Sequence, residues 1–148
     1  MDHEKLRDLF DQWGIQHFRP EEVTRLSRWN THRVPDDDLL ENIEQAIRIV
    51  DSARSALGAP VRCTSGYRPE EYNSLVGGSP TSEHMDFKAL DLQPVNSGQM
   101  GRFRSIVSAI VNYARHLGID VRVIHYETFV HIDVNADPEK PSTGLDAR

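Results

Sequence analysis

The stretch Phe129-Val130-His131-Ile132-Asp133-Val134 decides the architecture, because apolar and polar side chains alternate along it. Alternation with a period of two is typical of a β-strand that buries one face. The Val and Ile side chains are expected to pack on helices, so His131 and Asp133 lie on the opposite face. Phe87–Leu92 has the same parity, with Asp91 on the face opposite Leu90 and Leu92. Two strands with polar groups on one face predict a sheet that carries a site.

The segments around these strands predict an α+β fold. Ile119–Tyr126 is also rich in β-formers and is separated from the deciding strand by Glu127-Thr128, which predicts a hairpin. Apolar residues recur with a period near 3.6 over 36–57 and 99–117, which predicts two long helices, ended by Gly58 and Gly118. Shorter helices are expected over 3–13 and from Pro20. Residues 65–86 read as a long loop with a helical turn around Glu70–Val76, and a short β-like stretch precedes it at 60–64. The fold is therefore expected to be a small antiparallel sheet packed against helices.

Length and composition exclude several classes of protein. The 148 residues suit one domain, expected over residues 1–134, followed by a loose tail over 135–148. A net charge of −6 argues against nucleic acid or an anionic membrane surface as partner, and no apolar run is long enough for a membrane span. Cys63 is the single cysteine, which excludes an intrachain disulfide, and it is expected to pack as a small apolar residue. The first fifteen residues lack an apolar core, so no secretory signal is predicted. The protein is expected to be made in the cytoplasm and to act on a cell wall only after its release.

Spacing alone points to a metal site. His84 lies seven positions before Asp91, and if the two strands are neighbours, His84, Asp91 and His131 can converge. Two histidines and one carboxylate that leave a position for water suit a catalytic zinc or another divalent ion. The alternatives are an interior histidine and a carboxylate that caps or pairs. Four other histidines have no carboxylate at a spacing that would place it on the same face: His3, His17, His32 and His116. The sequence gives His125 no clear role.

Four ordered motifs resemble one family. They are Ser65-Gly66-Tyr67-Arg68, then Asn73 with Val76-Gly77-Gly78, then Ser82-x-His84 with Asp91, and finally Phe129-Val130-His131-Ile132-Asp133. The pattern resembles the signature of the D-alanyl-D-alanine carboxypeptidase family of zinc peptidases, which shares its zinc fold with lysostaphin-type endopeptidases and the hedgehog amino-terminal domain. The resemblance covers about residues 18–134. It departs at Phe87, where many relatives carry Gly and where the large side chain is expected to narrow the cleft.

The resemblance implies roles for individual residues. His84, Asp91 and His131 would bind Zn²⁺. Arg68 would bind a substrate carboxylate or the oxyanion, the alternative being a surface arginine that pairs with Glu70 or Glu71. Several relatives place the acid that moves the proton three positions before the last histidine, where this chain has Thr128. Asp133 and Glu127 are the candidates that remain. Asp133 is favoured as general base because strand parity places it on the face of His131, whereas the turn leaves the direction of Glu127 open. Ser65 and Ser82 are expected to order the loop, because no Ser-His-Asp pattern accompanies them.

The function predicted is hydrolysis of peptide bonds in peptidoglycan stem peptides or cross-links, as a carboxypeptidase or an endopeptidase. The peptidoglycan peptide is the expected partner, and the chain would come from a phage or a bacterium. Two other classes stay open, namely a non-catalytic zinc-binding recognition domain of the same fold and a virion-associated structural module. The sequence does not distinguish which bond is cut.

Overall fold

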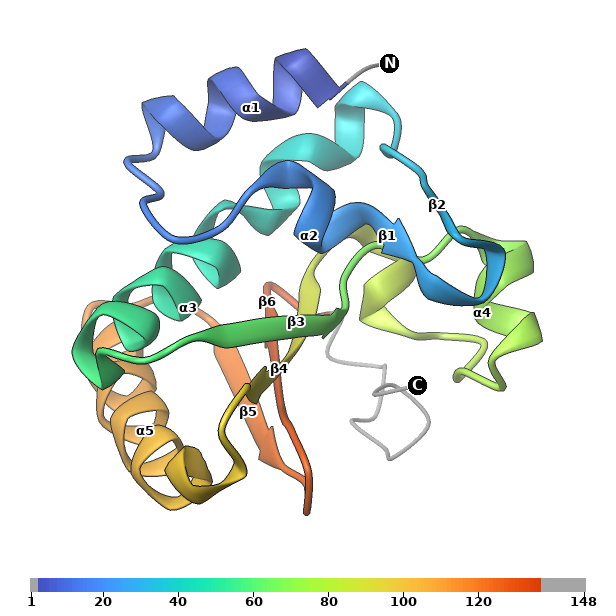
Figure 1. The fold of residues 1–148 in the computed structure, drawn as a ribbon. Helices are drawn as coiled ribbons and strands as arrows, with labels where there is room; N and C mark the ends of the chain where they lie inside the picture. The colour runs from blue at the N-terminus through green and yellow to red at the C-terminus, as the bar shows by residue number, and fades with distance from the viewer. Residues whose placement is uncertain (1–2, 137–148) are drawn as a thin grey trace.

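A computed structural model describes residues 3–136, so that most of the tail expected over 135–148 lies outside the described residues. The α+β class is confirmed (Figure 1). The elements follow in the order α1 (His3–Gln12), α2 (Pro20–Thr24), β1 (Arg25–Leu26), η1 (Ser27–Trp29), β2 (Thr31–His32), η2 (Asp37–Ile43), α3 (Glu44–Leu57), β3 (Val61–Ser65), α4 (Glu70–Leu75), η3 (Glu83–Asp86), β4 (Ala89–Pro94), η4 (Ser97–Gln99), α5 (Met100–His116), β5 (Val121–His125) and β6 (Val130–Val134).

The main sheet is antiparallel with the strand order β3-β4-β6-β5. The strand that comes last among the described residues, β6, thus lies between β4 and β5. In this register Asp91 lies opposite His131, and Ala89 lies opposite Asp133. Directly opposed residues of antiparallel strands share a face, so the two central strands bring Asp91, His131 and Asp133 to one face of the sheet.

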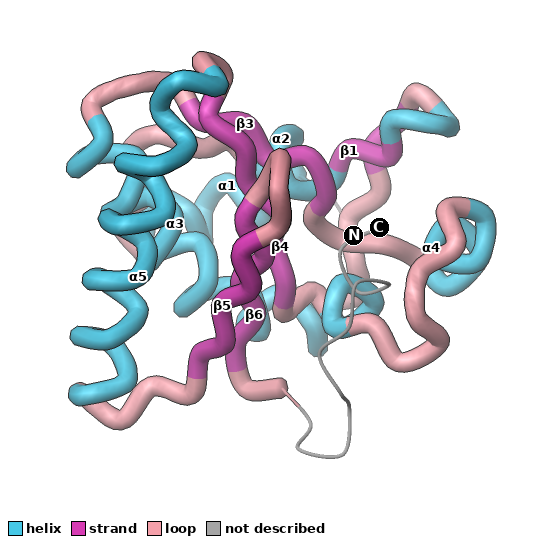
Figure 2. The backbone as a smooth tube through the Cα atoms, turned by 90° about the horizontal axis from the view of Figure 1, so that it is seen from below, coloured by secondary structure: helices cyan, strands magenta, loops and turns pink. Residues whose placement is uncertain are grey.

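The other face of the sheet carries the core. Leu90, Leu92, Val130, Ile132 and Val134 are buried there in one cluster with apolar residues of the helices. Figure 2 shows α3 and α5 on one side of the strands, with α4 and β1 on the other. The expected packing of the Val/Ile face on helices is therefore confirmed, and the polar face looks toward the α4 side.

Two local features differ from the sequence-based prediction. The helix expected over 36–57 begins as the 3₁₀-helix η2 and becomes α-helical only at Glu44. Tight 3₁₀ turns are frequent at helix N-termini, and here Asn42 of η2 donates a 2.8 Å hydrogen bond to the carbonyl of Asp86, which ties the turn to η3. The two-residue strands β1 and β2 form a small sheet of their own, too short to give an alternating pattern. None of the helices over residues 3–136 is long and apolar enough to cross a membrane.

Candidate metal centre

Three of the predicted residues meet at one point. One side-chain nitrogen or oxygen from each of His84, Asp91 and His131 lies within 4.8 Å of the others, and all three side chains are fully buried. Asp91 and His131 come from β4 and β6, while His84 comes from η3, directly before β4. Such a set could hold a metal ion.

His84 is oriented so that one ring nitrogen is left for a ligand. Its Nδ1 lies 2.8 Å from the carbonyl oxygen of Gly66, which can only accept, so Nδ1 carries the proton. Nε2 then faces Oδ2 of Asp91 at 3.2 Å, and neither atom has a hydrogen-bond partner within the described residues. Buried polar atoms without a partner are rare in proteins. A lone pair on nitrogen and a carboxylate oxygen facing each other fit a cation placed between them.

His131 lies between two carboxylates. Its Nδ1 is 2.7 Å from Oδ1 of Asp91, and its Nε2 is 2.8 Å from Oδ2 of Asp133. Asp133 also accepts hydrogen bonds from Arg122 of β5, at 2.7 Å from Nε and 3.0 Å from Nη2. Both oxygens of Asp133 are therefore engaged, and its side chain is fully buried.

The charges around the site follow from these contacts. Burial lowers the pKa of His131, but hydrogen bonds to Asp133 and Asp91 outweigh burial and raise that pKa to about 9. Burial also lowers the pKa of His84, and although Asp91 opposes this, the net shift is downward. Burial raises the pKa of Asp91, but the two histidines outweigh it and lower the pKa. Without a metal, the site thus holds an ionised Asp91, a neutral His84 and a protonated His131 near pH 7.

The Ser-Gly-Tyr-Arg motif supports His84 through its backbone. The backbone N–H of Arg68 donates a hydrogen bond to the carbonyl of His84 at 3.1 Å, while the carbonyl of Gly66 accepts the hydrogen bond from Nδ1 of His84. A Cβ at Gly66 would lie 2.1 Å from the carbonyl oxygen of Val23, so only glycine fits this close approach. The loop is consequently fixed against α2 on one side and against the candidate metal ligand on the other.

Arg68 itself is buried. Only 1% of the residue is exposed, and its Nη2 donates to Oγ of Ser82 at 3.4 Å. The alternative of a surface arginine beside Glu70 or Glu71 is therefore wrong. Oγ of Ser82 also accepts the backbone N–H of His84 at 3.2 Å, so Ser82 caps η3 and orders the loop as predicted.

The sequence matches one known protein family. The family model described as Peptidase M15 matches residues 16–133, which is most of the chain. The chain belongs to the M15 peptidase family. No curated protein and no solved structure matches it. The predicted resemblance is confirmed, and the protein is a zinc metallopeptidase that acts on peptidoglycan.

Phe87 of this M15 peptidase corrects an expectation. It adopts a left-handed backbone with φ of 55°, a conformation in which glycine is free of strain. The phenyl ring is fully buried in the core and meets Tyr67 edge-on, with ring centroids 5.8 Å apart. The expectation that Phe87 narrows the cleft is therefore wrong, because the ring fills the core.

The Gly-Gly motif of this M15 peptidase makes room for Arg68. A Cβ at Gly78 would lie 2.1 Å from Oδ1 of Asn73 and 2.9 Å from Nη1 of Arg68. Asn73 is buried in α4 and donates to the carbonyl of Ser79 at 2.8 Å. The motif thus packs the loop between α4 and η3 around the guanidinium group.

Other candidates lie away from the three ligand-type side chains. Glu127 is exposed in the β5–β6 turn and lines a cavity of about 220 Å³ together with Arg62 and Gln93 at the end of the sheet. His125 faces α5, where its Nε2 lies 3.1 Å from Oγ of Ser108. Burial raises the pKa of the Cys63 thiol, which keeps it protonated and consistent with packing as an apolar residue.

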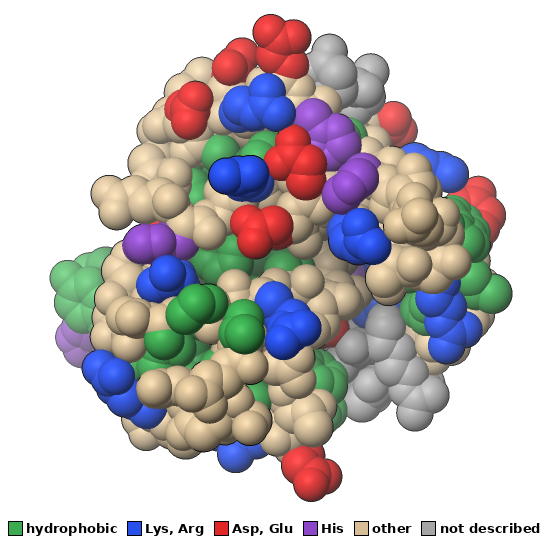
Figure 3. Space-filling model, in the orientation of Figure 1, with side chains coloured by type: hydrophobic (Ala, Val, Ile, Leu, Met, Phe, Trp, Pro, Cys, Tyr) green, Lys and Arg blue, Asp and Glu red, His purple; other side chains and the backbone are tan. Residues whose placement is uncertain are grey.

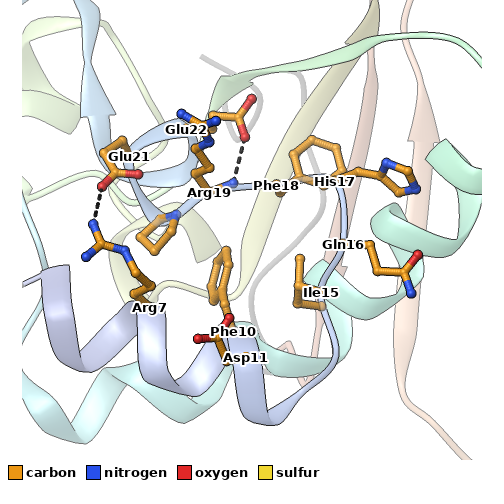
Figure 4. A pocket seen from close by; sticks show the side chains of 11 residues that line it. Arg7, Phe10, Asp11, Ile15, Gln16, His17, Phe18, Arg19, Glu21 and Glu22 are labelled. Carbon is orange, nitrogen blue, oxygen red and sulfur yellow. Dashed lines mark hydrogen bonds and ion pairs between the residues drawn. The ribbon is translucent and has the colours of Figure 1, made fainter.

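Two larger cavities differ in their relation to the site. The larger, about 910 Å³, lies between α1 and α2 and contains none of the candidate ligands; Arg7 pairs with Glu21 across it (Figure 4). Apolar side chains show between the charged ones on this face of the molecule (Figure 3). The second, about 440 Å³, is lined in part by Ser65, the register partner of Asp91. Only the second cavity therefore adjoins the candidate metal centre.

Sequence reasoning missed two of the contacts that build the site. The carbonyl of Gly66 belongs to a loop 18 residues before His84, and no local sequence pattern predicts its hydrogen bond with the His84 ring. Arg122 could have been found, because a hairpin that turns at Glu127-Thr128 places it opposite Asp133. Charged residues opposite each other in neighbouring strands pair across the sheet.

Proposed function

We propose that His84, Asp91 and His131 are the zinc ligands of this peptidase. The observation that carries the proposal is the buried pair of His84 Nε2 and Asp91 Oδ2, which face each other at 3.2 Å without a hydrogen-bond partner among residues 3–136. Nδ1 of His131 lies on the same side, beside Asp91. When bound by three protein ligands, zinc polarises a carbonyl group and lowers the pKa of water to about 7, which is the chemistry that peptide hydrolysis needs.

The proposed reaction is cleavage of a peptide bond in peptidoglycan stem peptides or cross-links. Arg68 is proposed to supply positive charge beside His84, where it would stabilise the oxyanion or bind a terminal carboxylate. The two roles predict different enzymes. If Arg68 binds the terminal carboxylate, the protein is a carboxypeptidase, whereas if Arg68 only stabilises the oxyanion, it is an endopeptidase.

Amidation of the substrate C-terminus separates these roles. A carboxypeptidase should lose most of its rate on the amide, and Arg68→Lys should reduce that loss, because lysine keeps the charge but lacks the planar fork. An endopeptidase should accept the amide and still be slowed by Arg68→Lys. A carboxypeptidase whose discrimination survives Arg68→Lys would contradict the proposed role of Arg68.

Asp133 as general base stays a prediction, with Glu127 as the alternative. The contacts of Asp133 also support a positioning role. A carboxylate that accepts the second N–H of a ligand histidine fixes the ring and raises its basicity. With Nδ1 of His131 directed at the metal, Nε2–H would donate to Asp133, which Arg122 holds in place.

The proposed function is tested with purified muropeptides and zinc-loaded protein. Mass spectrometry should detect hydrolysis that a chelator abolishes and added zinc restores. His84→Ala should abolish both turnover and zinc binding. Intact muropeptides together with tight zinc binding would instead favour a non-catalytic recognition domain of the same fold.

A further inference from the structure

A cationic pocket lies beside the candidate metal centre. Its volume is about 440 Å³, and its lining residues are Arg25, Ser27, Arg28, Thr64, Ser65, Tyr72 and Val76. They come from β1 and η1, from the end of β3, and from α4 and the residue that follows it. The lining contains two arginines, four hydroxyl groups and no carboxylate, in a protein whose net charge is −6.

The pocket touches the metal centre through β3. Ser65 is the register partner of Asp91, and directly opposed residues of antiparallel strands have Cβ atoms about 5 Å apart on one face. Oγ1 of Thr64 donates to the carbonyl of Asp91 at 3.3 Å. The register shifts between Cys63 and Ser65, a bulge of the kind that re-aims side chains near active sites. The distance from Asp91 to the pocket is therefore about the length of one residue, so a substrate bound at Asp91 can place a neighbouring group in the pocket.

The arginines of the pocket are available to a ligand. Both Arg25 and Arg28 are exposed, and neither forms an ion pair within residues 3–136. Arg25 makes a long hydrogen bond of 3.4 Å to Oδ1 of Asn30. The segment from β1 to β2 contains no acidic residue.

Tyr72 fixes the pocket wall. Its hydroxyl accepts the backbone N–H of Arg28 at 3.0 Å, and its ring meets Trp29 edge-on with centroids 4.9 Å apart. These contacts hold η1 against α4, so the backbone that carries Arg28 has a defined place relative to β3. Two arginine side chains with hydroxyl groups around them suit a planar anion such as a carboxylate.

We propose that the pocket lined by Arg25 and Arg28 binds a carboxylate that branches from the peptide substrate next to the bond that is cut. The proposal rests on the proposed function and narrows the substrate class to peptides with a free side carboxylate. This carboxylate is distinct from the C-terminal one considered for Arg68, because the pocket and Arg68 involve different side chains.

The test uses two synthetic stem peptides with the same C-terminus. One carries a free side carboxylate and the other its amide. Wild-type zinc-loaded protein should cleave the free acid with a kcat/KM about ten-fold or more above the amide, mostly through KM, because charge-assisted hydrogen bonds are lost in the amide. Arg25→Gln/Arg28→Gln should reduce this preference to about two-fold or less. Arg48→Gln, which removes a charge from the far side of the sheet on α3, is the matched control and should keep the preference.

Calorimetry gives a readout that does not need turnover. The zinc-loaded protein should bind an uncleavable analogue of the free-acid peptide about ten-fold or more tightly than its amide, and the double variant should lose this difference. A preference that survives in the double variant, or a wild type that treats both peptides alike while cleaving them, would overturn the pocket assignment. Failure to cleave either peptide would count against the proposed function, and the binding comparison would still decide the pocket.

Discussion

Replacing Asp133 by Asn separates its two proposed roles. Asp133 accepts three charge-assisted hydrogen bonds, from Nε and Nη2 of Arg122 and from Nε2 of His131. Asn keeps the shape but loses the charge and one acceptor. If Asp133 orients His131, the zinc affinity should fall about 10- to 100-fold, which is about 1.4–2.7 kcal/mol. The metal-free protein should also lose about 2–3 kcal/mol of its free energy of unfolding, less than a fully buried pair would lose, because Arg122 is 26% exposed and can return to water.

Zinc affinity is measured by competition with a chromogenic chelator at a temperature where the variant is folded, and stability by urea unfolding. Arg122→Gln should weaken zinc binding in the same direction, since it releases Asp133. Asp120→Asn, at an exposed acid just before β5, is the control and should change neither quantity. Unchanged zinc affinity in Asp133→Asn together with a turnover reduced about 100-fold or more would refute the positioning role and support the general base. If Glu127→Gln is inactive while Asp133→Asn turns over normally, Glu127 is the base.

Three further results are expected. Zinc binding displaces the proton of His131, so the apparent zinc affinity should rise about ten-fold per pH unit up to the pKa of about 9. In the metal-free protein this folded-state pKa lies above the unfolded value, so protonation of His131 stabilises the fold fully below about pH 6.5. Urea titrations should show that this stabilisation is lost as the pH rises through 9. Phe87→Gly should relieve about 1 kcal/mol of left-handed backbone strain but lose about 3–5 kcal/mol of buried ring, a net destabilisation of about 2–4 kcal/mol measurable by calorimetry. Gly66→Ala should unfold more easily and lose zinc, because its Cβ meets the carbonyl of Val23. Gly101→Ala, on an open face of α5, is the control and should be neutral or stabilising. Equal stability and zinc binding of the two variants would contradict the close approach of Gly66 to Val23.

The sheet and its polar face could be predicted because their signal is local. A strand has a period of two, so Asp91, His131 and Asp133 are assigned to a face without knowledge of the rest of the molecule. The turn at Glu127-Thr128 then sets the register of β5 against β6. The ends of the two long helices are also a local signal, because Gly58 and Gly118 both adopt the left-handed conformation that ends a helix.

The surroundings of the site could not be predicted because they depend on contacts between distant segments. Arg68 looks like a surface residue in a polar loop, yet packing of α4 and η3 buries it. The orientation of His84 depends on a carbonyl 18 residues away, and the space for that carbonyl depends on α2. Side-chain identity at these positions gives the motif, whereas burial and hydrogen-bond partners emerge only when the loop folds against the sheet.

The position of β6 between β4 and β5 has a consequence for how the chain folds. His84 and Asp91 lie only seven positions apart in the sequence, but His131 belongs to the last of the strands over residues 3–136, which must enter the middle of the sheet. The complete zinc site therefore forms only when the longest-range pairing of the sheet is made, and such pairings are the slow step in small proteins. Zinc cannot nucleate this fold as it does in a zinc finger. It would instead lock the finished sheet, so the metal should slow unfolding far more than it speeds folding.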